Sequence, residues 1–436
     1  MATPVTSPRG MRDFLPVDKA NRERALGVIR RSFTAHGFDE IETPVMEDAA
    51  RLHSGLGGDN EKLGFAVLKR GLSPDAVRAA ADNVQDLADL GLRFDLTVPL
   101  ARFYASHRAE LPAVFRAIQI APVWRAERPQ KGRFRQFVQC DIDIIGEAGP
   151  LAEIELITAT AATLAELGLT GCSIRINDRR ILTGLLTHWG VAPEAGERAL
   201  ITLDKLDKLG VSGVVAELDA LAIVGPAVSA AEMTATLTEL GAGGWALGGP
   251  GAAGEADVAD GPAPAWLDAA AFADLKALRA ALPGVDLVFD PTLVRGMGYY
   301  TGTIFEISHP DLGYSLGGGG RYDGMIGRFL GTDVPACGFS IGFERIVDLL
   351  AADAASADNA VVLVHDSAAD PAGLVALKTA LVANGLRVRL ERRSKNLKAL
   401  LERAAAAGYG RFALVGPDTT DVTTLEFKPL GPPERA

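Results

Sequence analysis

The sequence predicts an α+β protein: an antiparallel sheet with helices packed on it, a helical insertion, and a small α/β domain at the C-terminal end. The first observation is a series of strand-like segments joined by turns or helices, because short connections favour antiparallel neighbours. These segments lie at residues 117–124, 134–145, 173–176, 304–307 and 336–341. The second is a regular alternation of strands and helices after residue 359, which is typical of a mainly parallel sheet.

Length and composition limit the class of protein. The 436 residues exceed the roughly 250 to 300 at which a single core stops growing, so we expect two or three domains. The net charge of −11 argues against a histone-like affinity for nucleic acid. The chain has no run of about 18 apolar residues and no signal-like start, so we expect a cytoplasmic protein with no membrane span. The cysteines and histidines form no CxxC or HExxH pattern, which leaves oxygen ligands for any metal.

The N-terminal elements follow from local patterns. Residues 19–37 have helical apolar periodicity with a glycine at the end. Residues 38–46 alternate like a strand, and Pro44 places that strand at an edge or bend. Residues 55–90 contain no clear strand, so we expect a surface excursion before the chain returns to the core.

The C-terminal half contains an insertion and a second domain. Residues 181–282 have helical tendency, and the Gly/Ala/Pro-rich segment 241–266 within them is expected to be mobile. A polar linker of small residues begins at 351. Beyond it, strands are expected over 360–365, 386–390 and 411–415, and helices over 371–384 and 396–407.

The densest chemical signal is a basic hairpin over residues 124–146. Pro129 and Gly132 divide it, and five of the eleven residues 125–135 are Lys or Arg. Strand alternation places one set of side chains on a common face: Arg125 and Glu127 on one arm, and Arg133, Arg135, Phe137 and Gln139 on the other. Guanidinium groups beside a flat ring suit the phosphates and base of a nucleotide. The alternative is a solvated loop with structural ion pairs.

Three further segments carry candidate ligand-binding groups. Arg295 lies beside two glycines and Tyr299–Tyr300, which suits a ligand approached by backbone, although a packed Gly-rich turn explains the same pattern. Four glycines from 317 are not followed by GKS or GKT, so a P-loop is rejected. Arg345 lies in the first turn of a helix, where the dipole disfavours a cation, so it either points at a ligand or is solvent-exposed.

Asp95 and Thr97 form the last candidate. They are two residues apart and therefore share a face of an extended segment. A carboxylate beside a hydroxyl suits an ammonium group. The alternative is that one of them caps a helix that begins near Pro99.

In combination, these motifs resemble the histidyl-tRNA synthetases, a family of class II aminoacyl-tRNA synthetases. GMRDFLP (10–16) resembles the N-terminal signature, and GFDEIETPVME (37–47) resembles motif 1, the dimer interface. WRAERPQKGRFRQF (124–137) resembles motif 2, and GFSIGFERI (338–346) resembles motif 3. LVRGMGYYTGTIFE and GGGRYDG resemble the histidine-specific stretches, and all of these occur in the family's order.

The resemblance implies ATP-dependent activation of L-histidine, transfer to tRNA(His), and roles for individual residues. For ATP, it assigns the α-phosphate to Arg125, the adenine amino group to Glu127, the terminal phosphates to Arg133, and the two faces of the adenine to Phe137 and Arg345. Arg295 would lie near the α-phosphate and the histidine carboxylate, which makes Arg125, Arg295 and Arg345 the catalytic set. Mg²⁺ would bridge the leaving phosphates, with no protein ligands assigned to it.

For histidine, the resemblance assigns the α-ammonium group to Asp95, Thr97 and Gln139, and the imidazole to Asp143 and Tyr300, with Tyr299 and Arg295 in the same pocket. Asp95 and Asp143 replace a Glu that many bacterial members carry, and Gly298 replaces an Asp. These departures shorten or remove acidic side chains at the edge of the pocket.

The resemblance also divides the chain and suggests partners. It implies a homodimer, a catalytic domain over 1–176 and 285–350, a helical insertion over 177–284, a linker over 351–358 and an anticodon-binding-like domain over 359–436. A basic edge of that last domain could meet tRNA phosphates; it comprises Arg392, Arg393, Lys395 and Lys398. Two alternatives remain: the synthetase-like regulatory subunit of ATP phosphoribosyltransferase, and a tRNA-sensing module without catalysis.

Overall fold

The computed structural model describes residues 5–52, 63–129, 132–241, 264–295, 298–350 and 359–431. The chain forms two compact units. The first comprises Met1–Arg12 and Leu26–Leu349, and the second Asp13–Ala25 and Leu350–Ala436. The predicted linker and most of the segment 241–266 lie outside the described residues. The predicted domain boundaries stay a prediction.

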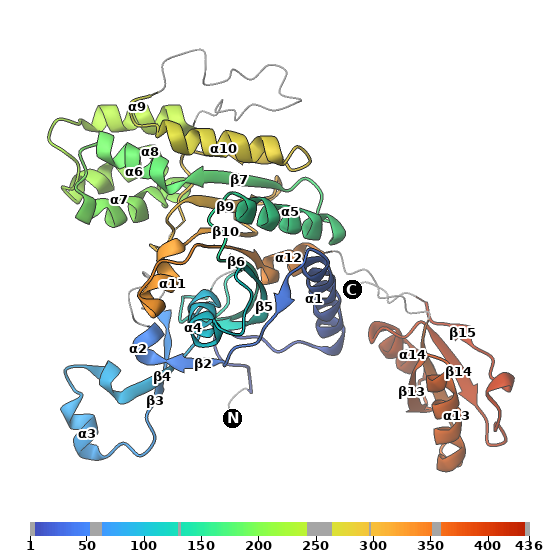
Figure 1. The fold of residues 1–436 in the computed structure, drawn as a ribbon. Helices are drawn as coiled ribbons and strands as arrows, with labels where there is room; N and C mark the ends of the chain where they lie inside the picture. The colour runs from blue at the N-terminus through green and yellow to red at the C-terminus, as the bar shows by residue number, and fades with distance from the viewer. Residues whose placement is uncertain are drawn as a thin grey trace. The chain divides into compact units, whose positions relative to one another are not determined.

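The first unit is built on one eight-stranded sheet (Figure 1). In spatial order its strands are β1 (Asp39–Glu40), β5 (Phe115–Trp124), β6 (Gln136–Ile145), β11 (Ala336–Gly342), β10 (Gly317–Arg321), β9 (Thr303–Ser308), β7 (Ser173–Asp178) and β8 (Leu287–Phe289). Adjacent strands are antiparallel except the two terminal pairs, β1·β5 and β7·β8, which are parallel. The predicted sheet is confirmed, and β1 is at its edge as expected.

Helices cover this sheet. They are α1 (Pro16–Ala35), α4 (Thr97–His107), α5 (Leu151–Glu166), α11 (Asp323–Leu330) and α12 (Phe343–Leu349). The helix α5 packs on β6 and β11 and buries Leu156 and Ile157 completely. Phe305 on β9 and Phe339 on β11 stack with ring centroids 5.3 Å apart. Together these apolar contacts hold rigid the central strands that carry the site.

Between β7 and β8 the chain forms a group of helices that Figure 1 shows beside β7. They are α6 (Arg179–His188), α7 (Gly196–Leu203), α8 (Leu206–Ala220), α9 (Ala230–Gly241) and α10 (Ala269–Ala281). Asp178 is the N-cap of α6, and its side chain accepts a hydrogen bond from the backbone N–H of Arg180. The predicted helical tendency after residue 181 is confirmed.

The expectation of no strand within 55–90 is wrong. The structure has a three-stranded sheet ordered β2 (Met46–Asp48), β4 (Ala88–Leu92) and β3 (Phe65–Leu68), with α2 (Ala49–Leu52) and α3 (Pro74–Ala79) beside it. The strand β3 is four residues long and alternates between half-buried and exposed positions, so it lacks the apolar run of a core strand. The strand predicted over 38–46 is likewise divided, since β1 and β2 belong to different sheets on either side of Pro44.

The second unit contains the predicted α/β fold. A four-stranded sheet ordered β13-β12-β14-β15 is parallel except at β14·β15. Its elements are β12 (Ala360–His365), α13 (Pro371–Ala383), β13 (Arg387–Arg392), α14 (Leu397–Ala406), β14 (Arg411–Val415) and β15 (Lys428–Pro429). Each predicted strand and helix is confirmed to within two residues. Across both units, no helix of the described residues has the length and apolarity that crossing a membrane requires.

Candidate active site

One cavity of about 580 Å³ in the first unit brings all the predicted site residues together. They are Asp95, Thr97, Arg125, Glu127, Arg133, Phe137, Gln139, Asp143, Arg295, Tyr299, Tyr300 and Arg345. These side chains come from segments more than 200 residues apart in the sequence. The sheet brings these distant segments together, because β6, β11, β10 and β9 are neighbouring strands in it.

The basic hairpin exists, but its arginines do not lie on its strands. β5 ends at Trp124 and β6 begins at Gln136, so Arg125, Glu127 and Arg133 belong to the connection between them. Arg125 is nevertheless held firmly: its Nε donates to the carbonyl oxygen of Phe94 at 2.9 Å, and its guanidinium lies 5.2 Å from the ring centroid of Phe137. Glu127 and Arg133 form an ion pair at 3.5 Å.

Acidic side chains gather on one wall of the cavity. Gln139, Asp141 and Asp143 alternate along β6 and therefore point to the same face. With Asp95, the two aspartates form what we call the acidic cluster (Asp95, Asp141 and Asp143), and each of its members is at most 4% exposed. Burial raises the pKa of Asp143 to about 7, and this rise is opposed by a hydrogen bond from the Tyr322 hydroxyl at 2.6 Å. Burial, and then the charge of Asp143, raise the pKa of Asp141.

Asp95 lies at the start of α4 and also lines the cavity. Thr97 is the first residue of α4, so the expected extended segment is wrong. Asp95 accepts a hydrogen bond at 3.2 Å from the backbone N–H of Val98 and supports the first turn of that helix. The carboxylate is therefore fixed by the helix that it caps.

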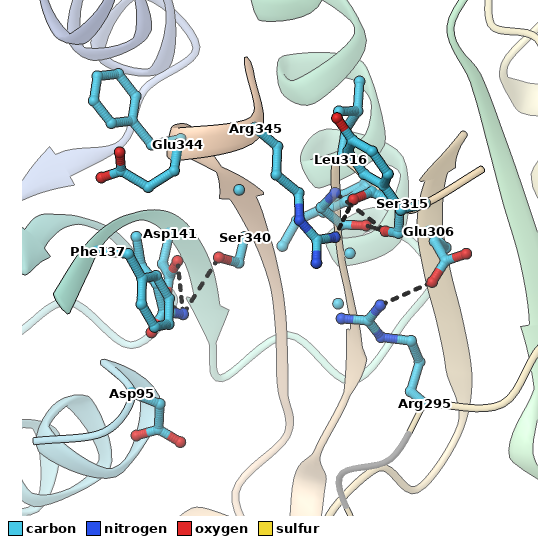
Figure 2. Close-up of a pocket in the computed structure, with 18 of the residues that line it drawn as sticks. Asp95, Phe137, Asp141, Arg295, Glu306, Ser315, Leu316, Ser340, Glu344 and Arg345 are labelled. Carbon is cyan, nitrogen blue, oxygen red and sulfur yellow. Dashed lines mark hydrogen bonds and ion pairs between the residues drawn. The ribbon is translucent and has the colours of Figure 1, made fainter. Parts of the chain in front are cut away.

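Arginines gather on another wall, and we call Arg133, Arg295 and Arg345 the arginine cluster. Figure 2 shows Arg295 and Arg345 apart from Asp95 and Asp141. Arg295 donates to Glu306 on β9 at 3.1 Å, and a Cβ at Gly318 on β10 would lie 2.8 Å from its guanidinium carbon. The glycines of β10 thus leave room for this side chain.

Arg345 lies in the first turn of α12, as predicted, and faces the cavity rather than solvent. Its guanidinium donates to the carbonyl oxygen of Ser315 and lies 5.2 Å from the ring centroid of Tyr314. Burial, and then the charges of Arg133 and Arg295, lower the pKa of Arg345. The mutual repulsion of these cations is relieved by an anion bound among them.

A hydrogen-bonded relay joins the two walls. Thr97 bonds to Tyr299, Tyr299 to Tyr300, and Arg295 to Tyr300. Burial raises the pKa of both tyrosines, and the charge of Arg295 opposes that rise at Tyr300. The Tyr300 hydroxyl lines the cavity, where it can donate or accept a hydrogen bond.

Several cavity residues were missed by the sequence interpretation. They are Asp141, Glu306, Tyr314, Tyr322 and Glu344, together with Asp204, Asp207 and Lys208 at the α7–α8 junction. Period-two spacing from Gln139 to Asp143 was the available signal for Asp141. Nothing local marks Glu344, which accepts from the backbone N–H of Val138 at 3.2 Å and pairs with Arg12.

An exposed acidic side chain of the insertion lies beside Gly298. A Cβ at this position would lie 2.1 Å from a carboxylate oxygen of Glu197 on α7. The insertion therefore places an acidic group where a side chain at 298 would otherwise be. A larger residue at 298 requires Glu197 to move.

Sequence comparisons find relatives over nearly the whole chain. The family profile described as Histidyl-tRNA synthetase matches residues 10–346. The chain is 63% identical to the histidine–tRNA ligase of Leifsonia xyli subsp. xyli, with 99% of both chains covered, and 43% identical to a probable histidine–tRNA ligase of Tropheryma whipplei, with 98% and 99% covered.

Solved structures share the fold. The histidyl-tRNA synthetase of Nostoc sp. PCC 7120 superposes with a TM-score of 0.71 at 24% identity, covering 98% of this chain and 97% of that one. A Bacillus halodurans protein described as an ATP phosphoribosyltransferase regulatory subunit/histidyl-tRNA synthetase gives 0.73 at 23%, covering 95% and 100%. The profile match and the full-length identity at 63% decide the relationship. The chain belongs to the histidyl-tRNA synthetase family.

Proposed function

We propose that the cavity between the acidic and arginine clusters carries out both steps of histidine–tRNA ligation. The enzyme uses ATP to activate L-histidine to histidyl-adenylate and then transfers the histidyl group to the 3′ end of tRNA(His). The observation that carries the site assignment is the joining of two oppositely charged walls in one cavity. Histidine brings an ammonium group and ATP brings phosphates, so each substrate matches one wall.

Histidine binds at the acidic cluster. Its α-ammonium group is received by Asp95, Thr97 and Gln139, where buried carboxylates need a cation. The imidazole lies between Asp143 and Tyr300. Asp143 accepts from the ring N–H, and the Tyr300 hydroxyl donates to the other ring nitrogen. A neutral imidazole satisfies both groups, and an amino acid without these nitrogens leaves them unpaired.

ATP binds at the arginine cluster and along the hairpin connection. The adenine lies between Phe137 and Arg345 with its amino group at Glu127, and Arg125 and Arg133 receive phosphate oxygens. An oxygen of the histidine carboxylate attacks the α-phosphorus, a new O–P bond forms, and the bond to pyrophosphate breaks. Arg125 and Arg295 offset the negative charge that builds up, because fixed cations stabilise such a transition state without reorganising. No side-chain nucleophile is needed.

The second step uses the same cavity. A ribose hydroxyl at the tRNA 3′ end attacks the carbonyl carbon of the adenylate, and AMP leaves with the bonding electrons. The arginine cluster again faces the departing phosphate. The tRNA is also contacted by the second unit, where Arg392, Arg393, Lys395 and Lys398 are all exposed. Such charges position a nucleic acid through its phosphates.

Mg²⁺ is the expected partner of the leaving phosphates. Within the described ranges, no group of three or more His, Cys, Asp or Glu residues could hold a metal ion. Among the carboxylates near the arginines, Glu127, Glu306 and Glu344 are engaged in ion pairs, and Asp204 lies within the influence of Arg295. These residues fit a Mg²⁺ bound chiefly through ATP oxygens and water. Mg²⁺ bound there would neutralise charge on pyrophosphate as it leaves.

The chain acts as a cytoplasmic homodimer in this proposal. The motif 1 region supports self-association, because the three-stranded sheet and its flank expose apolar side chains. These are Val45, Met46, Leu68 and Leu90, each between 37% and 61% exposed. Burial of such a patch against a second copy is favourable, and two-fold symmetry is the common outcome.

Amino-acid-dependent exchange between ATP and labelled pyrophosphate, run with each of the twenty amino acids, tests the proposal. We expect exchange with histidine alone, followed by charging of tRNA(His). Exchange with no amino acid from folded protein in the presence of Mg²⁺ would contradict it and favour a regulatory or tRNA-sensing role. The retained Arg125, Arg295 and Arg345 at one cavity argue against those alternatives.

A further inference from the structure

The carboxamide of Gln139 is held by two hydrogen bonds on the cavity wall. Its Nε2 lies 3.2 Å from Oδ2 of Asp141 and 3.4 Å from Oγ of Ser340. Asp141 on β6 and Ser340 on β11 are direct partners across the two strands, and Figure 2 shows them next to each other. A carboxamide nitrogen carries two N–H groups, so both donors of Gln139 are in use.

The directions of these hydrogen bonds are set by Asp141. A hydrogen bond from Ser340 lowers the pKa of Asp141 against the effect of burial, so the serine hydroxyl is the donor there. The oxygen of Ser340 is then free to accept from Gln139. The Nε2 of Gln139 can only donate, so Asp141 accepts from Gln139 as well as from Ser340.

The remaining polar atom of Gln139 is its Oε1. This oxygen is buried, and it has no hydrogen-bond partner within the part of the chain that the structure describes. With Nε2 committed on the other side, Gln139 offers a ligand an acceptor and no donor. A group that brings N–H donors satisfies such an oxygen, whereas a carboxylate or phosphate does not.

We infer that Asp141 is a positioning residue that holds the Gln139 carboxamide with its Oε1 toward the α-ammonium group of histidine. The inference rests on the proposed function, which places the ammonium at Gln139, and adds the reason why that amide faces the right way. A free amide can turn over and present N–H groups that repel an ammonium. The bound ammonium in turn favours the charged form of Asp141, since a nearby cation lowers the pKa of a carboxyl group.

Variants that move the carboxylate from position 141 to position 139 test this role. The variants are Asp141→Asn, Gln139→Glu and the double variant, all made in the full chain. The Asp141→Asn side chain offers a donor as well as an acceptor, so the Gln139 amide can bond to it in either orientation. We expect the KM for histidine to rise about tenfold in pyrophosphate exchange while the KM for ATP stays within about twofold. Gln139→Glu alone places two carboxylates in contact, and we expect it to raise the KM for histidine too. In the double variant the glutamate presents an acceptor oxygen in either orientation, so the KM for histidine should return toward the wild-type value.

A second measurement separates the ammonium from the rest of the substrate. Histidinol retains the ammonium group, and imidazolelactate carries a hydroxyl in its place. Asp141→Asn should weaken inhibition by histidinol as much as it weakens histidine, and should leave inhibition by imidazolelactate unchanged. Equal weakening of both inhibitors, or no rescue in the double variant, overturns the inference and makes Asp141 a structural residue.

Failure of the inference is distinguishable from failure of the proposed function. A wild-type protein without histidine-dependent exchange contradicts the proposed function itself. Thermal unfolding of each variant identifies a fold that is lost. If Asp141→Asn does not fold, Ser340→Ala removes one of the two amide contacts, and we expect a smaller rise in the KM for histidine with the same selectivity for histidinol. An unchanged KM in Ser340→Ala then overturns the inference.

Discussion

The acidic cluster and the arginine cluster occupy one cavity but are stabilised in opposite ways. Asp141 and Asp143 lie on a central strand with raised pKa values, so burial works against their charges. Two of the arginines have partners in the protein, since Arg295 bonds to Glu306 and Tyr300 and Arg133 pairs with Glu127. Burial lowers the pKa of the third, Arg345. The acidic wall is thus short of cations before substrate arrives, whereas the basic wall is partly neutralised by the protein itself.

This difference explains how one cavity holds two substrates in a defined direction. A cation lowers the electrostatic cost of the acidic wall, and an anion lowers the repulsion among Arg133, Arg295 and Arg345. Tyr300 is affected by both walls of the cavity, because Arg295 lowers its pKa and Asp141 raises it. In the proposed binding mode, the histidine carboxylate faces the phosphates, which is the geometry that attack requires.

The largest effect is expected from the basic wall. Arg295→Gln removes a fixed cation beside the reacting phosphate, and we expect kcat for pyrophosphate exchange to fall about 100- to 1000-fold. Arg175→Gln is the matched control, because Arg175 also pairs with Glu306, at 3.1 Å, but does not line the cavity. A comparable loss in both variants would show that the role of Arg295 is to hold Glu306 and not to stabilise the transition state.

The acidic wall should respond selectively to its own substrate. Asp143→Asn keeps the shape of the side chain and removes the charge that receives an imidazole N–H. We expect kcat/KM for histidine to fall about 10- to 100-fold, with the KM for ATP little changed. Steady-state exchange at varied histidine and varied ATP measures both. An equal effect on the two substrates would contradict the separation of the two walls.

A smaller effect is expected where the basic wall meets solvent. The side chain of Arg133 is 45% exposed, so water and salt screen its charge. We expect Arg133→Ala to raise the KM for ATP about three- to tenfold at low salt, and less at high salt. The exposed neighbour Arg128 does not line the cavity, and Arg128→Ala should leave the KM for ATP unchanged.

The smallest expected effect is on the pH dependence of kcat/KM for histidine. Asp143 must be ionised to accept from the imidazole, and its pKa is about 7, so kcat/KM for histidine should rise as pH increases through neutrality. The Tyr322 hydroxyl lowers that pKa, and Tyr322→Phe should therefore move the rise to higher pH. Profiles of kcat/KM for the two proteins measure the displacement. A displacement to lower pH would contradict the assignment of the titrating group.

Much of the fold could be predicted because local sequence patterns identify most of its helices and strands. The C-terminal strands and helices are buried, periodic and separated by turns, and each agrees with the structure. The small sheet of β2, β4 and β3 could not be predicted in this way, since its short strands are half exposed and pair only once the chain has folded. β10 is composed almost entirely of glycine, which does not favour a strand. It forms a strand because it pairs with β9 on one side and β11 on the other.

The sequence by itself determined the family, most of the element order and twelve of the residues that line the cavity, because those properties are recorded in residue types and spacing. Tertiary structure alone decided how the residues act on one another. Gln139 on β6 bonds to Ser340 on the neighbouring strand β11, and Tyr300 bonds to Arg295. The raised pKa of Asp143 likewise depends on burial, and burial is a property of the packed sheet that no single segment carries.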